Sequence, residues 1–136
     1  GTVPIVGVFN GCQFTDPTTG EQVFQNFYPA STNASDIIAF IVDDPNVVYE
    51  VQADDTFPVA DLFGNFDIVY TSAGSTLTGI SGAELDVTTG ATATTLPIKA
   101  IDISQDPNNS DVGSANTNVL VVIQNSVFGV KGAGLA

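Results

Sequence analysis

Short runs of β-branched and aromatic residues, each bounded by Gly, Pro, Asn or Asp, recur along the whole chain. This pattern is typical of β-strands separated by turns. Seven strands are predicted from it: Val3–Phe9, Gln22–Phe27, Asp36–Val42, Val47–Ala53, Phe66–Ala73, Leu96–Ser104 and Asn118–Asn125. The chain is therefore expected to form an all-β domain, either a β-sandwich or a partly open β-barrel.

Two neighbouring runs differ in their periodicity. Ile37 to Val42 is apolar at every position, which predicts a central strand that is covered on both faces. Val47 to Ala53 alternates apolar and polar residues, so its strand should be covered mainly on one face. The turn residues Asp43 to Asn46 between them predict a hairpin connection, and Thr15 to Glu21 predicts another hairpin tip just after Cys12.

The remaining segments read as connectors. PVADLFG, Pro58 to Gly64, predicts one short helix of one to two turns with Thr56 as its N-cap. Gly74 to Thr95 is rich in Gly, Ser, Thr and Ala with little periodicity, and it predicts a long loop. Loops of this length inside a small domain usually serve a function.

Composition narrows the class of partner. A chain of 136 residues suits one domain with a single core. Fifteen acidic residues face two basic ones, which gives a formal net charge of −13. Binding to nucleic acid or to anionic lipid depends on Lys and Arg, so neither is an expected partner. No apolar run reaches the roughly 18 residues needed to cross a bilayer.

The residue types also limit the possible chemistry. The chain has no histidine, so Cys12 has no imidazole base and no Ser–His–acid triad can form. We interpret Cys12 as a small buried residue and expect no catalytic residue. Glycoside hydrolysis by two carboxylates is an alternative, but the chain has no Trp and only three Tyr to line a sugar cleft.

Carboxylate clusters leave a hard cation as the remaining option. DPNNSD, Asp106 to Asp111, is the segment that comes nearest to a calcium loop, although it lacks the full spacing of one. A turn held by Asp and Asn side chains explains the same residues more simply. No cofactor is expected.

Several motifs nevertheless resemble a known family. These are G-x-x-x-G-C-x-F-T-D-P from Gly7 to Pro17, the Tyr-Pro-Ala that begins at Tyr28, and Asp-Asp-Pro from Asp43 to Pro45 ahead of a strand. Together with AGSTLTGISGAELD, TTLPIKAIDI and TNVLVVIQN, they resemble the small head proteins of tailed bacteriophages that decorate or cement the capsid. Such relatives carry a further β-rich segment upstream of Val3. Residues 1–136 are therefore expected to be a single decoration domain that lacks an upstream N-terminal segment.

The resemblance implies a structural virion protein without catalysis or cofactor. Its partner would be the outer face of the major capsid protein lattice, which it would bind as a homo-oligomer, a trimer before other states. Aromatic residues gather near the first hairpins, mostly as core, although a few can mark a contact surface. The predicted contact residues are Phe27, Tyr28, Pro29, Leu77, Ile80, Leu85, Val130 and Leu135. A calcium-dependent carbohydrate- or host-binding β-sandwich, such as an adhesin or a tail-tip module, is the alternative function.

Overall fold

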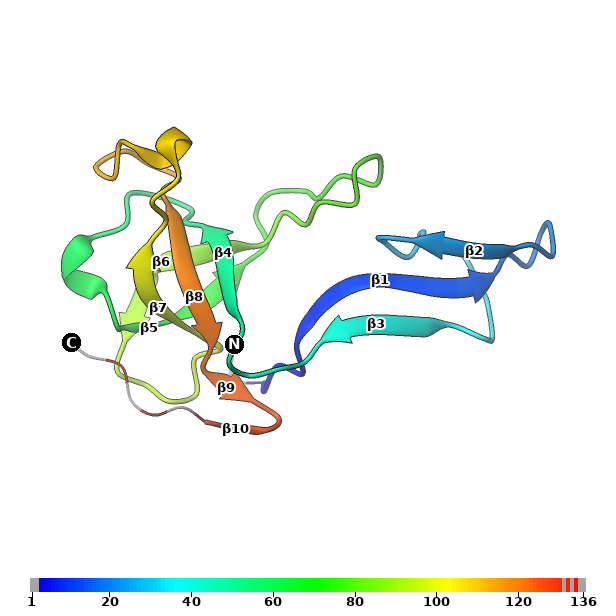
Figure 1. The fold of residues 1–136 in the computed structure, drawn as a ribbon, viewed down its shortest axis with the longest axis horizontal. Helices are drawn as coiled ribbons and strands as arrows, with labels where there is room; N and C mark the ends of the chain where they lie inside the picture. Colours follow the sequence, from blue (N-terminus) through cyan, green and yellow to red (C-terminus); the bar gives the residue numbers. More distant parts are fainter. Residues whose placement is uncertain (1–2, 131, 133, 135–136) are drawn as a thin grey trace.

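The computed structural model describes residues 3–130, 132 and 134, and strands form most of its regular structure. Figure 1 shows a rounded body and, to one side of it, an elongated arm. The arm is a three-stranded antiparallel sheet in the order β2-β1-β3, formed by β1 (Val8–Thr15), β2 (Gln22–Gln25) and β3 (Ile38–Val42). The prediction of an all-β domain is confirmed.

The body is an antiparallel sheet of five strands in the order β4-β8-β7-β5-β6. Its strands are β4 (Val48–Gln52), β5 (Asn65–Val69), β6 (Glu84–Ala91), β7 (Ile98–Ile103) and β8 (Asn118–Ile123). A small hairpin of β9 (Asn125–Ser126) and β10 (Gly129–Val130) follows β8. Two short 3-10 turns, η1 (Val59–Asp61) and η2 (Pro107–Asn109), connect strands at the rim.

The two edge strands of the body approach each other and turn the sheet into a partly open barrel. Ala53, just after β4, forms a parallel bridge with Leu85 of β6. Asp54 reinforces this seam, because its N–H donates to the Leu85 carbonyl oxygen at 3.0 Å and its Oδ1 accepts the Val87 N–H at 3.0 Å. One residue thus provides both a donor and an acceptor where the ladder is otherwise interrupted.

The core lies inside this barrel and follows from the alternation of the strands. In β8 the side chains of Val119, Val121 and Ile123 point inward, while the residues between them are half-buried. Phe57 and Phe66 pack against each other with their ring centroids 5.5 Å apart. Both are almost completely buried, and each aromatic ring contributes a large apolar area to the core.

The arm is attached to the body at both of its ends. On the entering side, Ile5 donates to the Asn125 carbonyl oxygen and accepts the Val127 N–H, so the chain is fixed beside β9. On the leaving side, β3 continues directly into β4 of the barrel. The two segments lie so close at the base of the arm that a Cβ on Gly7 would overlap the Val42 carbonyl oxygen.

Several strand predictions are confirmed, but the boundaries and pairings of others are wrong. The first strand begins at Val8, since residues 3–7 make an isolated bridge instead of a ladder. The turn at Asp43–Asn46 does form, with Asp44 Oδ1 accepting the Asn46 N–H at 2.8 Å. It does not close a hairpin, because β3 pairs with β1 and β4 pairs with β8.

The predicted connectors also differ. The segment Pro58–Gly64 forms a single 3-10 turn whose N-cap is the extended Pro58, so Thr56 does not cap it. The second half of the expected loop Gly74–Thr95 is strand β6, which pairs with β5 through a wide irregularity. The Thr89 hydroxyl fills this irregularity by accepting the Asp67 N–H at 2.9 Å. The Thr and Gly content of β6 hid it from a pattern based on apolar residues.

The seam gives a stability prediction. Replacing Asp54 with Ala removes the acceptor for the Val87 N–H, and we expect the free energy of unfolding to fall by about 1–2 kcal/mol. Urea denaturation would measure this loss. Asp55→Ala is the matched control, since it removes the same charge from an exposed side chain whose one bond within the described residues is to the adjacent Thr56 N–H. Equal losses in the two variants would contradict the assignment of the seam to Asp54.

Candidate functional site

The arm exposes more large apolar side chains than its size requires. Its register pairs Gln13 of the central strand with Phe24 on one side and with Ile38 on the other. Phe24 is 65% exposed and Ile38 is 53% exposed. A three-stranded sheet needs a covered face to be stable, so it matters which face the chain itself covers.

One face of the arm is covered by the segment that connects β2 to β3. Phe14 on this face is buried and meets the ring of Tyr28 edge-on, with centroids 5.3 Å apart. The Tyr28 hydroxyl donates to the Thr32 carbonyl oxygen at 2.8 Å and accepts the Ala34 N–H, which fixes the covering segment. Cys12 lies beneath it, 2% exposed, as the sequence predicted for a small buried residue.

The opposite face is open. Phe24, Ile38 and Phe40 share it, since Phe40 lies two residues after Ile38 and pairs with Gly11. A hollow of about 270 Å³ lies over Gly11 between the rings of Phe24 and Phe40. Gly11 has φ of 129° and a Cβ there would come within 2.9 Å of the Gln25 carbonyl oxygen, so a larger residue would not fit. We call Gly11, Gln13, Phe24, Ile38 and Phe40 the open face.

The strand β3 corrects a second expectation. Its continuous apolar run predicted a central strand, but among the described strands it pairs with β1 alone and lies at the edge of the arm. Ile38 to Ile41 are all exposed, with Phe40 and Ile41 each 44% exposed. The chain therefore places its most apolar strand where solvent reaches both faces and one edge.

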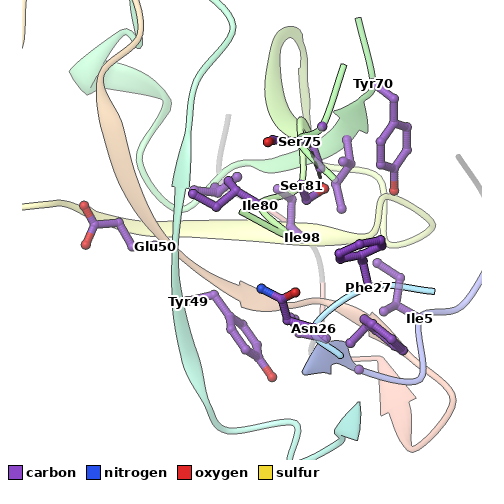
Figure 2. Close-up of a pocket in the computed structure, with 18 of the residues that line it drawn as sticks. Ile5, Asn26, Phe27, Tyr49, Glu50, Tyr70, Ser75, Ile80, Ser81 and Ile98 are labelled. Carbon is purple, nitrogen blue, oxygen red and sulfur yellow. Dashed lines mark hydrogen bonds between the residues drawn. The ribbon is translucent and has the colours of Figure 1, made fainter. Parts of the chain in front are cut away.

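A larger hollow separates the arm from the barrel. It has a volume of about 910 Å³ and is lined by Phe9 and Phe27 from the arm side, by Tyr49 and Tyr70 from the barrel, and by the loop between β5 and β6. Figure 2 shows Phe27, Tyr49 and Tyr70 as they come from these different segments. Glu50 is the one charged residue among the lining residues that the structure describes, and its carboxylate points away from the other labelled side chains.

Tyr49 has a perturbed hydroxyl in this hollow. It donates to the Val42 carbonyl oxygen at 3.2 Å, at the point where the arm meets the barrel. Burial, followed by the negative charges of Asp44 and Asp43, raises the pKa of Tyr49 above its ordinary value. The phenol therefore stays neutral and continues to donate throughout the physiological pH range.

The loop over this hollow is held by a single described side-chain bond to the arm. Asn26 Nδ2 donates to the Thr78 carbonyl oxygen at 2.7 Å. Gly79 follows with φ of 70°, and a Cβ there would overlap the Asn26 side chain. Leu77 and Ile80 extend from this loop and are 94% and 68% exposed.

The structure separates the predicted contact residues into different groups. Leu77 and Ile80 are exposed, while Phe27, Tyr28 and Pro29 are half-buried beside the arm. Leu85 was wrongly included, because it is completely buried in the barrel core and cannot reach another molecule. The side chain of Val130 and the whole of Leu135 lie outside the described residues.

The aromatic residues of the first hairpins were expected to be mostly core, and the open face was missed. Phe14 fits that expectation, but Phe24 and Phe40 are exposed. The sequence around β2 could not have indicated which face is open. Phe24 alternates with Val23 and Gln25, so each face of the strand receives both an apolar and a polar residue.

The carboxylates of Asp106–Asp111, the segment nearest to a calcium loop, are used by the fold. Asp106 caps η2 by accepting the Asn108 N–H at 2.8 Å, and Asp111 accepts the Gly113 N–H. Asp102 Oδ1 likewise accepts the Ile103 N–H. Across the described part of the chain, no three His, Cys, Asp or Glu side chains lie close enough together to hold a metal ion.

Compared with known proteins, the chain matches no family model, no curated protein and no solved structure. Among residues 3–130, 132 and 134, no helix has the length and apolar character that crossing a membrane requires.

The arm also contains one titrating contact that can be tested. Thr15 donates to Asp36 through its hydroxyl at 2.6 Å and through its N–H at 3.0 Å, which joins the end of β1 to the start of β3. These bonds, the hydroxyl first, lower the pKa of Asp36 below its ordinary value of 3.8. Their contribution is present above that value and is lost as the pH falls through the lowered pKa.

We expect Thr15→Val to raise the pKa of Asp36 toward 3.8, since the variant keeps the N–H donor and loses the hydroxyl. Carboxyl carbon chemical shifts followed by NMR during an acid titration would measure it. Thr18→Val is a suitable control, because Thr18 meets Asp16 through its N–H alone in the bonds described here. An unchanged Asp36 titration in Thr15→Val would exclude the hydroxyl as the cause.

Proposed function

We propose that this protein is a structural component of a tailed-phage head that binds the outer face of the major capsid protein lattice and stabilises the shell. The observation that carries the proposal is the arm, which projects from the barrel (Figure 1) and whose open face exposes apolar side chains. In keeping with the resemblance, the proposed form on the shell is a homo-oligomer, a trimer before other states.

An exposed apolar patch on a small acidic protein needs a physical explanation. Phe24, Ile38 and Phe40 lie on one face of the arm, around Gly11 and Gln13 of the central strand. Apolar residues that share a face in this way mark contact sites more often than isolated exposed residues do. Aromatic side chains beside a hollow resemble the anchors that dominate binding energy at protein interfaces. A protein whose function is to hold a neighbour is expected to have such a face.

The charge distribution agrees with a protein partner of opposite sign. The formal net charge is −13, and residues 3–44, which include the arm, contain five carboxylates and no Lys or Arg. Such a surface repels DNA, but it would be attracted to basic patches on the outside of a protein shell. The outer face of a head is a location where contact with the packaged DNA is not needed.

The large hollow gives no support to the alternative of glycoside hydrolysis. Two carboxylates facing each other are needed for glycoside hydrolysis, and the described lining contains Glu50 alone. The alternative of a calcium-dependent adhesin has less support, since Asp106 and Asp111 both accept backbone N–H groups within their own loop. We therefore retain a single function.

The proposal predicts that the purified chain sediments with heads assembled from the major capsid protein of the same virus. We expect binding to weaken between 0.15 and 1 M salt, because the Debye length falls from about 8 Å to about 3 Å. Heads carrying the chain should also disassemble at a higher temperature. A chain that stays in the supernatant with heads, or that binds duplex DNA tightly at 0.15 M salt, would contradict the proposal.

Calcium distinguishes the proposal from the adhesin. We expect the Tm of the protein in about 5 mM calcium to equal its Tm in a chelator within the error of the measurement. The reason is that a ligand raises Tm only when the native state binds it. Differential scanning calorimetry would measure this. A rise of several degrees that Asp106→Asn and Asp111→Asn abolish would favour the adhesin.

A further inference from the structure

The strand β3 lacks the protection that natural edge strands have. An edge strand usually carries a charge, a proline or a bulge that prevents pairing with another chain. β3 is Ile-Ala-Phe-Ile-Val, without charge or proline. The other edge of the arm, β2, is Gln-Val-Phe-Gln, which also lacks charge and proline but is one residue shorter and less apolar. Of the two edges, β3 therefore offers the longer apolar stretch.

The open part of this edge has defined limits. The Val42 carbonyl oxygen accepts the Tyr49 hydroxyl, so the edge available to another strand runs from Ile38 to Ile41. Asp36 lies before it, and Asp43 and Asp44 lie after it, all three exposed. The edge is therefore an apolar stretch with carboxylates at both ends.

We propose that an extended segment of a different protein pairs with the free edge of β3 and becomes the fourth strand of the arm. Pairing would satisfy the outward backbone groups of β3 and would cover Ile38 and Phe40 of the open face. The continuous apolar run of β3 is the pattern of a central strand, and the added strand would make it one. This inference rests on the proposed function, under which the segment belongs to the capsid lattice.

The charges at the ends of β3 favour a different protein over a second copy. Antiparallel pairing of two β3 strands would bring Asp36 of one copy near Asp43 of the other, and parallel pairing would align identical carboxylates. Like charges placed across a strand pair are destabilising. The complementary segment instead has Lys or Arg at both ends and apolar residues between them.

The spacing of those basic residues follows from the geometry of a strand. Asp36 and Asp43 are seven positions apart; Asp43 directly follows β3, whereas Asp36 lies in the bend before it and its carboxylate is bonded to Thr15 of β1. A partner segment with basic residues about seven positions apart would place one near each end of β3, where a long Lys or Arg side chain can extend toward the carboxylate. The specificity of the site would then come from the charged ends, and its affinity mainly from the apolar centre.

A model peptide tests this pairing independently of any phage head. The probe is Lys-Thr-Val-Thr-Val-Thr-Val-Lys, and the same peptide with Glu at both ends is its control. In NMR titrations of the full chain, we expect the amide signals of Ile38–Ile41 to shift with the Lys peptide. The Glu peptide should bind about tenfold more weakly or worse, because two ion pairs become repulsive contacts. Absence of shifts in β3, or equal binding of both peptides, would overturn the inference.

Two matched variants separate the edge from general apolar exposure. Ile38→Glu places a charge on β3, and Val59→Glu places the same charge at a similarly exposed residue of η1, outside the arm. We expect Ile38→Glu to lose at least about tenfold in affinity for the Lys peptide and for heads, and Val59→Glu to bind as the wild type does. Equal binding by the two variants would contradict the inference.

Hydrogen exchange on the wild-type chain covers the case in which Ile38→Glu disrupts the arm. Amides of Ile38–Ile41 should exchange more slowly in the presence of the Lys peptide, and unchanged exchange would overturn the inference. Sedimentation velocity tests whether a second copy of this chain pairs with β3 instead. The wild type and Ile38→Glu should have the same mass in solution. A lower mass for Ile38→Glu would show that the partner strand comes from another copy of this chain and would overturn the inference. If the peptide binds β3 but heads do not bind the chain, the proposed function fails and the pairing stands.

Discussion

A sheet of three strands cannot exist as a bare layer in water, and this constraint governs the arm. The chain meets it on one face, where Phe14 is buried under Tyr28 and the covering segment is fixed by the Tyr28 hydroxyl. It leaves the other face and the β3 edge uncovered. The barrel has no such deficit, because its strands enclose their own core around Phe57 and Phe66. The molecule thus combines a barrel that buries its own core with an arm that leaves one face and one edge uncovered.

Local patterns predicted the barrel better than the pairing of strands. The alternation in β4 and β8 follows directly from one buried face, and the sequence was sufficient to place both strands. Pairing depends on contacts between distant segments, so the turn at Asp43–Asn46 was correctly predicted but wrongly interpreted as a hairpin. β6 was missed because its Thr and Gly residues pair through backbone groups and through the Thr89 hydroxyl, which hydrophobic periodicity does not detect.

The residue types of the candidate site could be predicted from the sequence, but their arrangement in space could not. The concentration of aromatic residues near the first hairpins, and a small buried Cys12, could be read from the sequence. Which of Phe14 and Phe24 is covered depends on where residues 26–37 cross the sheet, and no short-range pattern encodes that crossing. The error at β3 is informative. A run that is apolar at every position predicts a strand covered on both faces, and the chain by itself does not provide that cover.

The double attachment of the arm determines how mechanical load would reach the barrel. A pull on the arm would be divided between the pairing of Ile5 with β9 and the continuation of β3 into β4. Force arriving through β4 would reach the pair of Val48 with Val122 first, at the end of the ladder with β8. The load would thus be divided between two anchors on the body, and neither would carry it alone.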